Sequence, residues 1–249
     1  MGKSIFVASG KGGVGKSTLV TGLGACLAAM GAEVLCVDAD AGIRSLDLLF
    51  GLENRTILDL GDIISGTCGL REAVVRHDSL PGLSLLNAPY SLDRISARGL
   101  AAVERYAAQS YDYVLVDCPA GAAEILQGAA RGADLGILVA TPEPTSIRAA
   151  EHAAAVASEA GGEALSLRLV LNRVQPETVG RNGLLNVDDA IDGVGVRLLG
   201  ILPEDPRITA YASSGRIPVL ESTGGAPAAM LRIARRITGQ RVQLPNFKA

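Results

Sequence analysis

Short, continuous apolar runs alternate with helical segments along most of the chain, and this alternation constrains the fold more than any other feature. Strands are expected at residues 4–9, 33–38, 83–87, 113–117, 135–140, 168–172 and 198–202. Helices are expected at residues 16–30, 97–109, 124–131, 145–160 and 226–238. The run at residues 135–140 is apolar throughout and does not alternate, which is typical of strands buried on both faces. The sequence therefore predicts an α/β fold with a doubly wound, mainly parallel sheet and helices on both faces.

The composition is that of a globular chain with a large core. Of the 249 residues, 48% are hydrophobic and 20% charged, and the net charge is −3. These values exclude a disordered chain and a globally basic nucleic-acid binder. Aromatic residues make up only 3% and Trp is absent, which argues against a stacking platform for single-stranded nucleic acid. No apolar run reaches the ~18 residues of a membrane-spanning helix, and the N-terminus lacks the apolar segment of a signal peptide.

The four cysteines form no CxxC or CxC pair, and with only two histidines a zinc site has little support. Cys26 and Cys36 lie in apolar segments and are expected to be buried, while Cys118 is expected to be a small turn residue. Cysteines used in this way indicate the reducing cytoplasm. Without internal repeats or a long linker, residues 1–240 are expected to form one domain and residues 241–249 a short tail.

The segment GKGGVGKS, from Gly10 to Ser17, matches the pattern G-x-x-x-x-G-K-[ST] between an expected strand and an expected helix. Its glycines let backbone N–H groups face phosphate oxygens, and the helix N-terminus adds a positive dipole. Lys16 is expected to reach the β- and γ-phosphates of ATP, and Ser17 to ligate Mg²⁺. The expected phosphate-binding residues are Gly10, Lys11, Gly12, Gly13, Val14, Gly15, Lys16, Ser17 and Thr18.

Three carboxylates are expected at the same edge of the sheet as this loop. Asp38 and Asp40 follow one strand, and Asp117 closes the run YVLVD. The carboxyl ends of parallel strands gather where ligands bind, so these groups are expected to hold Mg²⁺ and orient an attacking water. Asp38 and Asp117 join Ser17 as the expected metal set, and residues 119–121 form a candidate switch loop.

These motifs, and others along the chain, resemble the MinD-type ATPases within the MinD/ParA/nitrogenase-reductase class of P-loop NTPases. The resemblance covers roughly residues 3–240. It is carried by GKGGVGKST at 10–18, DADAGIRSLDLLFG at 38–51, DCPAG at 117–121, TPEPTSIRAA at 141–150, LNR at 171–173 and GILPED at 200–205. The stretches GIRSLDLLFG and PEPTSIRAA are similar to MinD-type proteins and not to plasmid ParA.

The resemblance implies roles at matching positions. Lys11 would cross a dimer interface to the partner's nucleotide, and Asp40 would position the attacking water. The implied catalytic residues are Lys11, Lys16, Asp40 and Asp117. Asn172 would hydrogen-bond the adenine edge beside Arg173, Glu143 would lie near the ribose across the dimer, and Pro203, Glu204 and Asp205 would close over the base.

The implied function is slow, Mg²⁺-dependent ATP hydrolysis, stimulated by a MinE- or MinC-like partner. An ATP-dependent homodimer would regulate placement of the division septum or a similar machine. The alternatives are a flagellar-number regulator of the same family, a ParA-type DNA-partitioning ATPase, a metal-insertion ATPase or iron-protein-like reductase, and a non-catalytic scaffold. A pI of about 5.5 argues against DNA binding, the missing CxxC motif against metal chemistry, and the intact site residues against a scaffold.

MinD-type proteins typically end in an amphipathic helix that binds membrane. Here residues 239–249 hold a proline, Pro245, and a single aromatic residue, Phe247, without a bulky apolar face. The basic residues Arg232, Arg235, Arg236, Arg241 and Lys248 add only electrostatic attraction. Intrinsic membrane binding is therefore expected to be weak or absent, and any association with the membrane to be weak or indirect. The location is expected to be cytoplasmic, with a peripheral position at the inner face of the cell membrane as the alternative.

Overall fold

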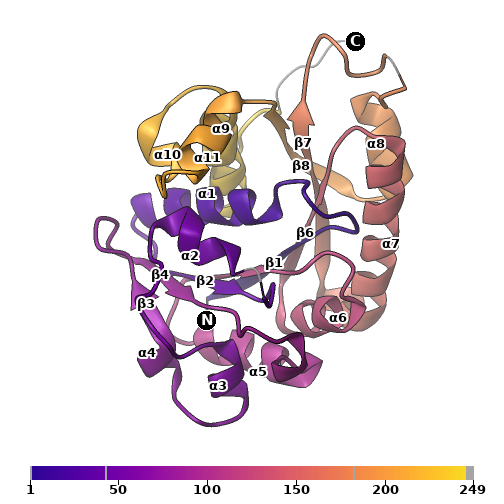
Figure 1. Cartoon of the computed structure of the whole chain (residues 1–249). Coiled ribbons are helices and arrows are strands. Elements are labelled where there is room, and N and C mark those ends of the chain that lie inside the picture. The colour runs from indigo at the N-terminus through magenta and orange to yellow at the C-terminus, as the bar shows by residue number, and fades with distance from the viewer. Residues whose placement is uncertain (1, 43, 182, 245–249) are drawn as a thin grey trace.

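A single eight-stranded sheet organises the computed structural model, which describes residues 2–42, 44–181 and 183–244 (Figure 1). The strand order is β3-β4-β2-β5-β1-β6-β7-β8. The strands are β1 (Lys3–Ala8), β2 (Val34–Asp38), β3 (Val74–Arg76), β4 (Leu83–Leu86), β5 (Tyr113–Asp117), β6 (Leu135–Ala140), β7 (Ser166–Val174) and β8 (Arg197–Pro203). All neighbouring strands pair in parallel except β3, which runs antiparallel to β4 at one edge.

The helices connect the strands and cover the sheet. They are α1 (Lys16–Ala29), α2 (Ser45–Phe50), α3 (Leu60–Ile64), α4 (Leu70–Ala73), α5 (Ala97–Ala107), α6 (Ala123–Gly132), α7 (Pro144–Gly161), α8 (Val187–Val194), α9 (Pro206–Ala212), α10 (Pro218–Glu221) and α11 (Gly225–Ile237). Two short 3₁₀ turns, η1 (Leu92–Arg94) and η2 (Gly162–Ala164), complete the set described.

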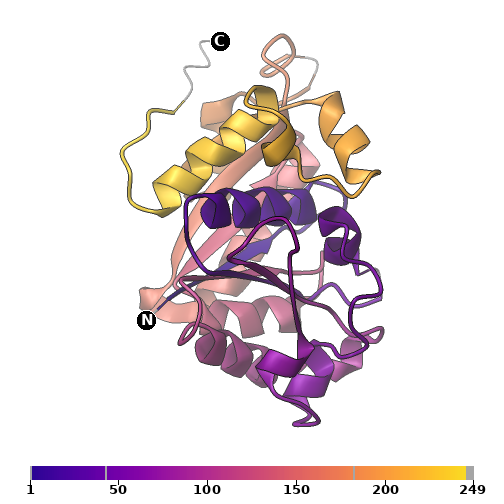
Figure 2. The same ribbon diagram turned by 90° about the vertical axis from the view of Figure 1, so that its left-hand side faces the viewer.

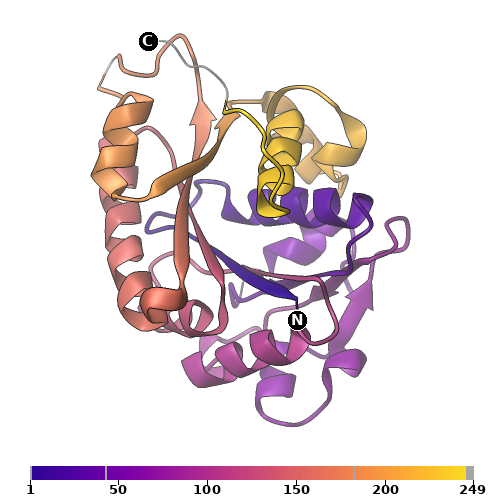
Figure 3. The same ribbon diagram turned by 180° about the vertical axis from the view of Figure 1, so that it is seen from behind.

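Two hydrophobic layers lie on opposite faces of the sheet. Helices α1, α2 and α11 contribute to one layer, and α5, α6, α7 and α8 contribute to the other. Successive residues of β5 alternate between them, because Val114 and Val116 join the second layer and Leu115 joins the first. Figure 2 shows α11 lying along α1, and Figure 3 shows α7 and α8 on the opposite side of β7. The doubly wound, mainly parallel α/β fold is therefore confirmed.

Every strand and helix predicted from the sequence is present, with ends displaced by at most two residues. Seven further elements were not predicted from the sequence: α2, α3, α4, α8, α9, α10 and β3. These elements span three to eight residues, which are too few to show a clear hydrophobic period. Periodicity along the sequence therefore does not reveal them. Cys26 and Cys36 are buried, as expected, and Cys118, which was expected only to be a small turn residue, is buried as well. Within the described ranges, no helix is both long and apolar enough to cross a membrane.

Candidate functional site

The loop between β1 and α1 lines an open hollow at the carboxyl edge of the sheet. Gly13 (φ 75°) and Gly15 (φ 96°) adopt left-handed conformations that favour glycine. A side chain on Gly10 would collide with the backbone oxygen of Ala149 in α7, since its Cβ would lie 2.1 Å away. Gly15 caps α1 without a side chain, so the first N–H groups of the helix stay available to an anion. Lys16, the first helical residue, is 7% exposed.

Two buried carboxylates stand side by side beneath this loop. Asp38 ends β2 and pairs in register with Asp117 at the end of β5, and both are fully buried. Burial, with the neighbouring charge of Asp117 adding to it, raises the pKa of Asp38 to about 8. Burial likewise raises the pKa of Asp117 to about 7. Ser17 and Lys16 lower this pKa, but their effect is smaller than that of burial. A further positive charge beside Asp38 and Asp117 would therefore be needed to lower both pKa values and favour the ionised carboxylates.

Asp38 uses both carboxylate oxygens to hold the segment that follows β2. Its Oδ1 accepts from the backbone N–H of Asp40 at 2.9 Å, and its Oδ2 accepts from the N–H of Leu46 at 3.1 Å. Asp38 was predicted to belong to the metal set. In the structure its carboxylate anchors Asp40 and Leu46, and this anchoring brings Ser45 to the site.

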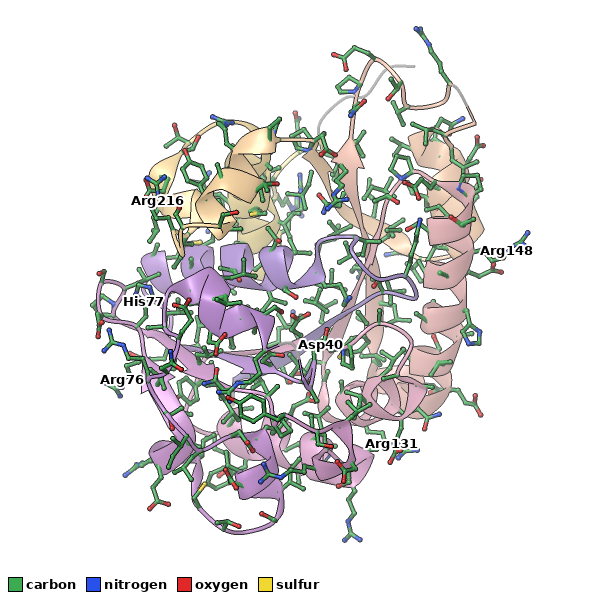
Figure 4. The ribbon with its side chains drawn as sticks, viewed as in Figure 1. Asp40, Arg76, His77, Arg131, Arg148 and Arg216 are labelled. Carbon is green, nitrogen blue, oxygen red and sulfur yellow. The ribbon has the colours of Figure 1, made fainter. Side chains whose placement is uncertain are left out.

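Asp40 and Ser45 face the phosphate loop across an open hollow. The Ser45 hydroxyl lies 3.1 Å from the Ser17 hydroxyl, and Asp40, Ser17 and Lys16 line the same hollow. Asp40 is half-buried, and burial raises its pKa while Lys16 lowers it. Figure 4 shows Asp40 near the middle of the molecule, between the phosphate loop and the sheet edge. Lys16 and the three carboxylates predicted from the sequence therefore converge.

A second pocket adjoins the phosphate hollow and holds the residues predicted to contact a base. It is lined by Gly15, Thr18, Asn172, Arg173, Pro203, Glu204, Asp205, Ile208, Thr209, Ala212, Ser213, Ala226 and Met230. The two hollows are continuous, because five residues line both of them: Gly15, Thr18, Arg173, Ala212 and Ser213. The contribution of α9 was missed from sequence, because a helix of seven residues gave no periodic signal.

Asn172 contacts the phosphate loop itself. Its Nδ2 donates to the backbone oxygen of Val14 at 2.7 Å, and its Oδ1 accepts from the N–H of Arg173 at 2.9 Å. Arg173 has a left-handed backbone, with φ 56°. In the structure the amide of Asn172 joins the end of β7 to the loop while Asn172 also lines the second pocket, and its contact with the adenine edge, implied by the resemblance, stays a prediction.

Lys11 and Glu143 form an ion pair within the chain. The Lys11 Nζ lies 2.6 Å from the Glu143 Oε2, and both side chains are nearly half exposed. Glu143 is the N-cap residue of α7. The resemblance assigned both residues to contacts across a dimer, and in the single chain they contact each other.

The residues around Asp117 suit Mg²⁺. Both Asp117 oxygens are buried and lack a hydrogen-bond partner among the described residues. Carboxylate oxygens are the ligands that a hard cation such as Mg²⁺ prefers. The Ser17 hydroxyl lies nearby on α1 and adds a second oxygen donor. The described residues include no cluster of three or more His, Cys, Asp and Glu side chains that could hold a metal by protein ligands alone. That donor set fits an ion held mainly by phosphate and water oxygens, as Mg²⁺ is.

Comparisons with known proteins agree with this geometry. The family described as the CobQ/CobB/MinD/ParA nucleotide binding domain matches residues 5–219. The septum site-determining protein MinD of Synechocystis is 37% identical over all of this chain and 94% of its own length. The structure of the MinC:MinD cell division complex of Aquifex aeolicus superposes with a TM-score of 0.88 at 34% identity, over 98% of each chain. MinD of Pyrococcus horikoshii, complexed with Mg-ADP, gives 0.84 at 27% identity over 95% of this chain and 96% of that one.

Fold and site together define a nucleotide-binding protein of the P-loop NTPase class, in which phosphate loop and strand-end carboxylates share one sheet edge. Within that class, the chain belongs to the MinD/ParA family of ATPases, on its septum site-determining MinD branch.

Proposed function

We propose that this chain is an ATP-driven switch that helps to place the cell-division septum. The observation that carries the proposal is the continuous hollow in which the phosphate loop, Lys16 and Asp40 meet beside the buried Asp117. Similarity to MinD proteins over the whole chain supports the cellular role. Residues 1–240 would act as one ATPase domain.

The residues would divide the work as follows. The backbone N–H groups of Gly10–Thr18 and the Lys16 ammonium would bind the β- and γ-phosphates. Ser17 and Asp117 would hold Mg²⁺, and Asp38, which lies beside Asp117 at the end of β2, would complete the metal set. When bound, Mg²⁺ would offset the phosphate charge. Asp40, which faces the hollow without being buried in it, would orient the attacking water.

The base would occupy the second pocket, between the ends of β7 and β8 and the start of α9. Pro203, Glu204 and Asp205 form one wall of that pocket, and Asn172 and Arg173 form another. Asn172 already supports the phosphate loop, so we propose that it links the base pocket to the phosphates through Val14.

ATP would hold two copies face to face, with Lys11 and Glu143 exchanging their mutual contact for contacts with the partner's nucleotide. Hydrolysis would remove the γ-phosphate and with it the differential binding that favours the dimer. The cycle would be slow, Mg²⁺-dependent and stimulated by a protein partner. The MinC seen with a MinD relative is the first candidate, and a MinE-like activator is the second.

We propose a cytoplasmic location with weak, peripheral membrane contact. In the tail, the backbone oxygens of Val242 and Gln243 accept hydrogen bonds from Arg236 at 3.0 and 2.6 Å, so this part lies against α11. The predictions that involve Pro245, Phe247 and Lys248 fall outside the described residues. Sedimentation with anionic vesicles in the presence of ATP would measure the contact.

Replacing Lys16 with alanine tests the site. The substitution removes the charge that faces the β- and γ-phosphates, so ATP binding and turnover should both fall at least tenfold. Arg131→Ala is a matched control, because Arg131 lies on α6 and lines neither hollow. ATP affinity unchanged by Lys16→Ala would contradict the site assignment.

A further inference from the structure

A bidentate ion pair locks the turn between β8 and α9. Arg207 donates from Nε to Asp205 Oδ1 at 2.8 Å and from Nη2 to Asp205 Oδ2 at 2.7 Å. Asp205 also caps α9, accepting from the backbone N–H of Arg207 at 3.2 Å. The Asp205 side chain is 6% exposed and that of Arg207 is 50% exposed, so the arginine lies on the solvent side of the buried carboxylate. Such two-point contacts fix geometry as well as charge.

The same pair reaches across to α11. Asp205 Oδ2 accepts from the N–H of Ala226 at 3.2 Å, and Arg207 Nη1 donates to the Ser222 hydroxyl at 3.2 Å. The space between is full: a Cβ on Gly225, whose φ is +61°, would lie 2.3 Å from Asp205 Oδ2. The fork formed by Asp205 and Arg207 therefore joins three segments, namely the end of β8, the start of α9 and the start of α11.

These three segments are walls of the second pocket. The turn after β8 contributes Glu204 and Asp205 to this lining, α9 contributes Ile208 and Ala212, and α11 contributes Ala226. Helix α9 has only seven residues, and a helix this short does not hold its position without tertiary contacts. The phosphate hollow includes neither member of the fork. Helix α9 reaches the phosphate hollow at its last residue, Ala212, and through the following Ser213, whereas Lys16, Ser17 and the glycine loop come from other elements. Loosening the fork would therefore disturb the base side of the site more than the phosphate side.

We infer that Arg207 is a positioning residue that holds the base pocket in shape through Asp205, and that it sets nucleotide affinity without entering the phosphate chemistry. This inference rests on the proposed function, in which the second pocket receives the base. Lysine cannot replace Arg207 fully, because an ammonium group does not match both carboxylate oxygens as a planar guanidinium does.

The test compares binding of Mg-ADP with binding of inorganic tripolyphosphate, which has phosphates but no base. In Arg207→Ala, ADP should bind about tenfold more weakly, the effect of losing one charged hydrogen-bond pair, while tripolyphosphate binding stays within about twofold. KM for ATP should rise about tenfold, with kcat at saturation within about twofold. Arg207→Lys should recover only part of the loss. Asp205→Asn, which keeps a capping side chain without the charge, should show the same pattern to a smaller extent.

Arg216→Ala is the matched control. Arg216 lies in the same part of the molecule, pairs with Glu221 at 3.4 Å and lines neither hollow (Figure 4). The inference is overturned if Arg207→Ala binds ADP as tightly as the unmodified protein does, or loses ADP and tripolyphosphate equally. If the unmodified protein binds tripolyphosphate as tightly as ADP, the base-pocket assignment itself fails, and the inference with it.

Discussion

At the scale of single residues, the ion pair between Lys11 and Glu143 within the chain excludes the contact with a partner's nucleotide that we propose for Lys11. The pair spans 2.6 Å and both groups are nearly half exposed to solvent. Exposed ion pairs contribute under about 1 kcal/mol to the free energy of unfolding. Breaking the contact therefore costs little free energy, as the proposed movement of Lys11 toward a second molecule requires.

Replacing Lys11 with alanine should separate stability from assembly. The melting temperature should change by no more than about 2–4 °C, because the pair is exposed. ATP should still bind, whereas ATP-dependent dimerisation in a hydrolysis-deficient background should be lost. Light scattering and nucleotide titration measure the two effects. Glu143→Gln breaks the same ion pair but keeps Lys11, and so serves as the stability control. A Lys11→Ala protein that still dimerises with ATP would refute the proposed contact.

At the scale of elements, β1, α5 and α6 enclose a carboxylic acid that the proposed chemistry does not use. Glu104 of α5 is fully buried, and its Oε2 accepts from the Ser4 hydroxyl of β1 at 2.7 Å. Its Oε1 lacks a partner among the described residues. Burial raises the pKa of Glu104 to about 8, against smaller opposing effects of Ser4 and Arg105. The group is therefore neutral below that pH, and its ionisation strains the packing of the three elements.

This arrangement gives stability a definite pH dependence. The folded-state pKa lies above that of the unfolded chain, so the protonated form stabilises the fold at low pH and this stability is lost as pH rises from about 4.5 to about 8. Glu104→Gln, which mimics the protonated acid, should raise the melting temperature at pH 9 by about 2–4 °C or more, the equivalent of one pKa unit.

Thermal unfolding of the Glu104→Gln variant and of the unmodified protein at pH 5.5 and pH 9 measures this difference. The gap between the two proteins should narrow at the lower pH. An equal gap at both values would show that Glu104 does not titrate in this range. Glu124→Gln, at an exposed position in α6, is the control for a change of charge alone.

The elements also show what a sequence can reveal. Long apolar strands such as β6 and periodic helices such as α5 carry their signal within themselves, and they were predicted with small errors at their ends. Helix α2 has only six residues, and its first turn is held by a hydrogen bond from the N–H of Leu46 to Asp38, which lies outside the helix. The phosphate loop could be predicted because strand, motif and helix are contiguous. The contacts of Asp205 with Ala226 and of Asn172 with Val14 join residues far apart in the chain, and the spacing of motifs does not encode them.

At the scale of the whole molecule, the proposed cycle requires two copies that remain together until the γ-phosphate leaves. Asp40 faces the hollow from the end of β2, where it would orient water without binding phosphate. Because orientation of water matters in the transition state more than in the ground state, Asp40→Ala should keep ATP binding and trap the dimer, with turnover reduced at least tenfold.

Size-exclusion chromatography in saturating ATP should show Asp40→Ala as a dimer and the same protein in ADP as a monomer. The double variant with Lys16→Ala should be monomeric in both, which controls for assembly without nucleotide. A monomeric Asp40→Ala protein that is shown to bind ATP would contradict either the face-to-face dimer or the role of Asp40.

The two hydrogen bonds of Asp38 have one further consequence. They secure Asp40 and Leu46 to the same carboxylate, so the chain between these residues is a tethered loop of set length. An added or deleted residue within it would force one of the two bonds to break, whatever the identity of that residue. Selection at this place would thus act on the number of residues between the two bonds as well as on the side chains, such as Ser45, that this spacing brings to the site.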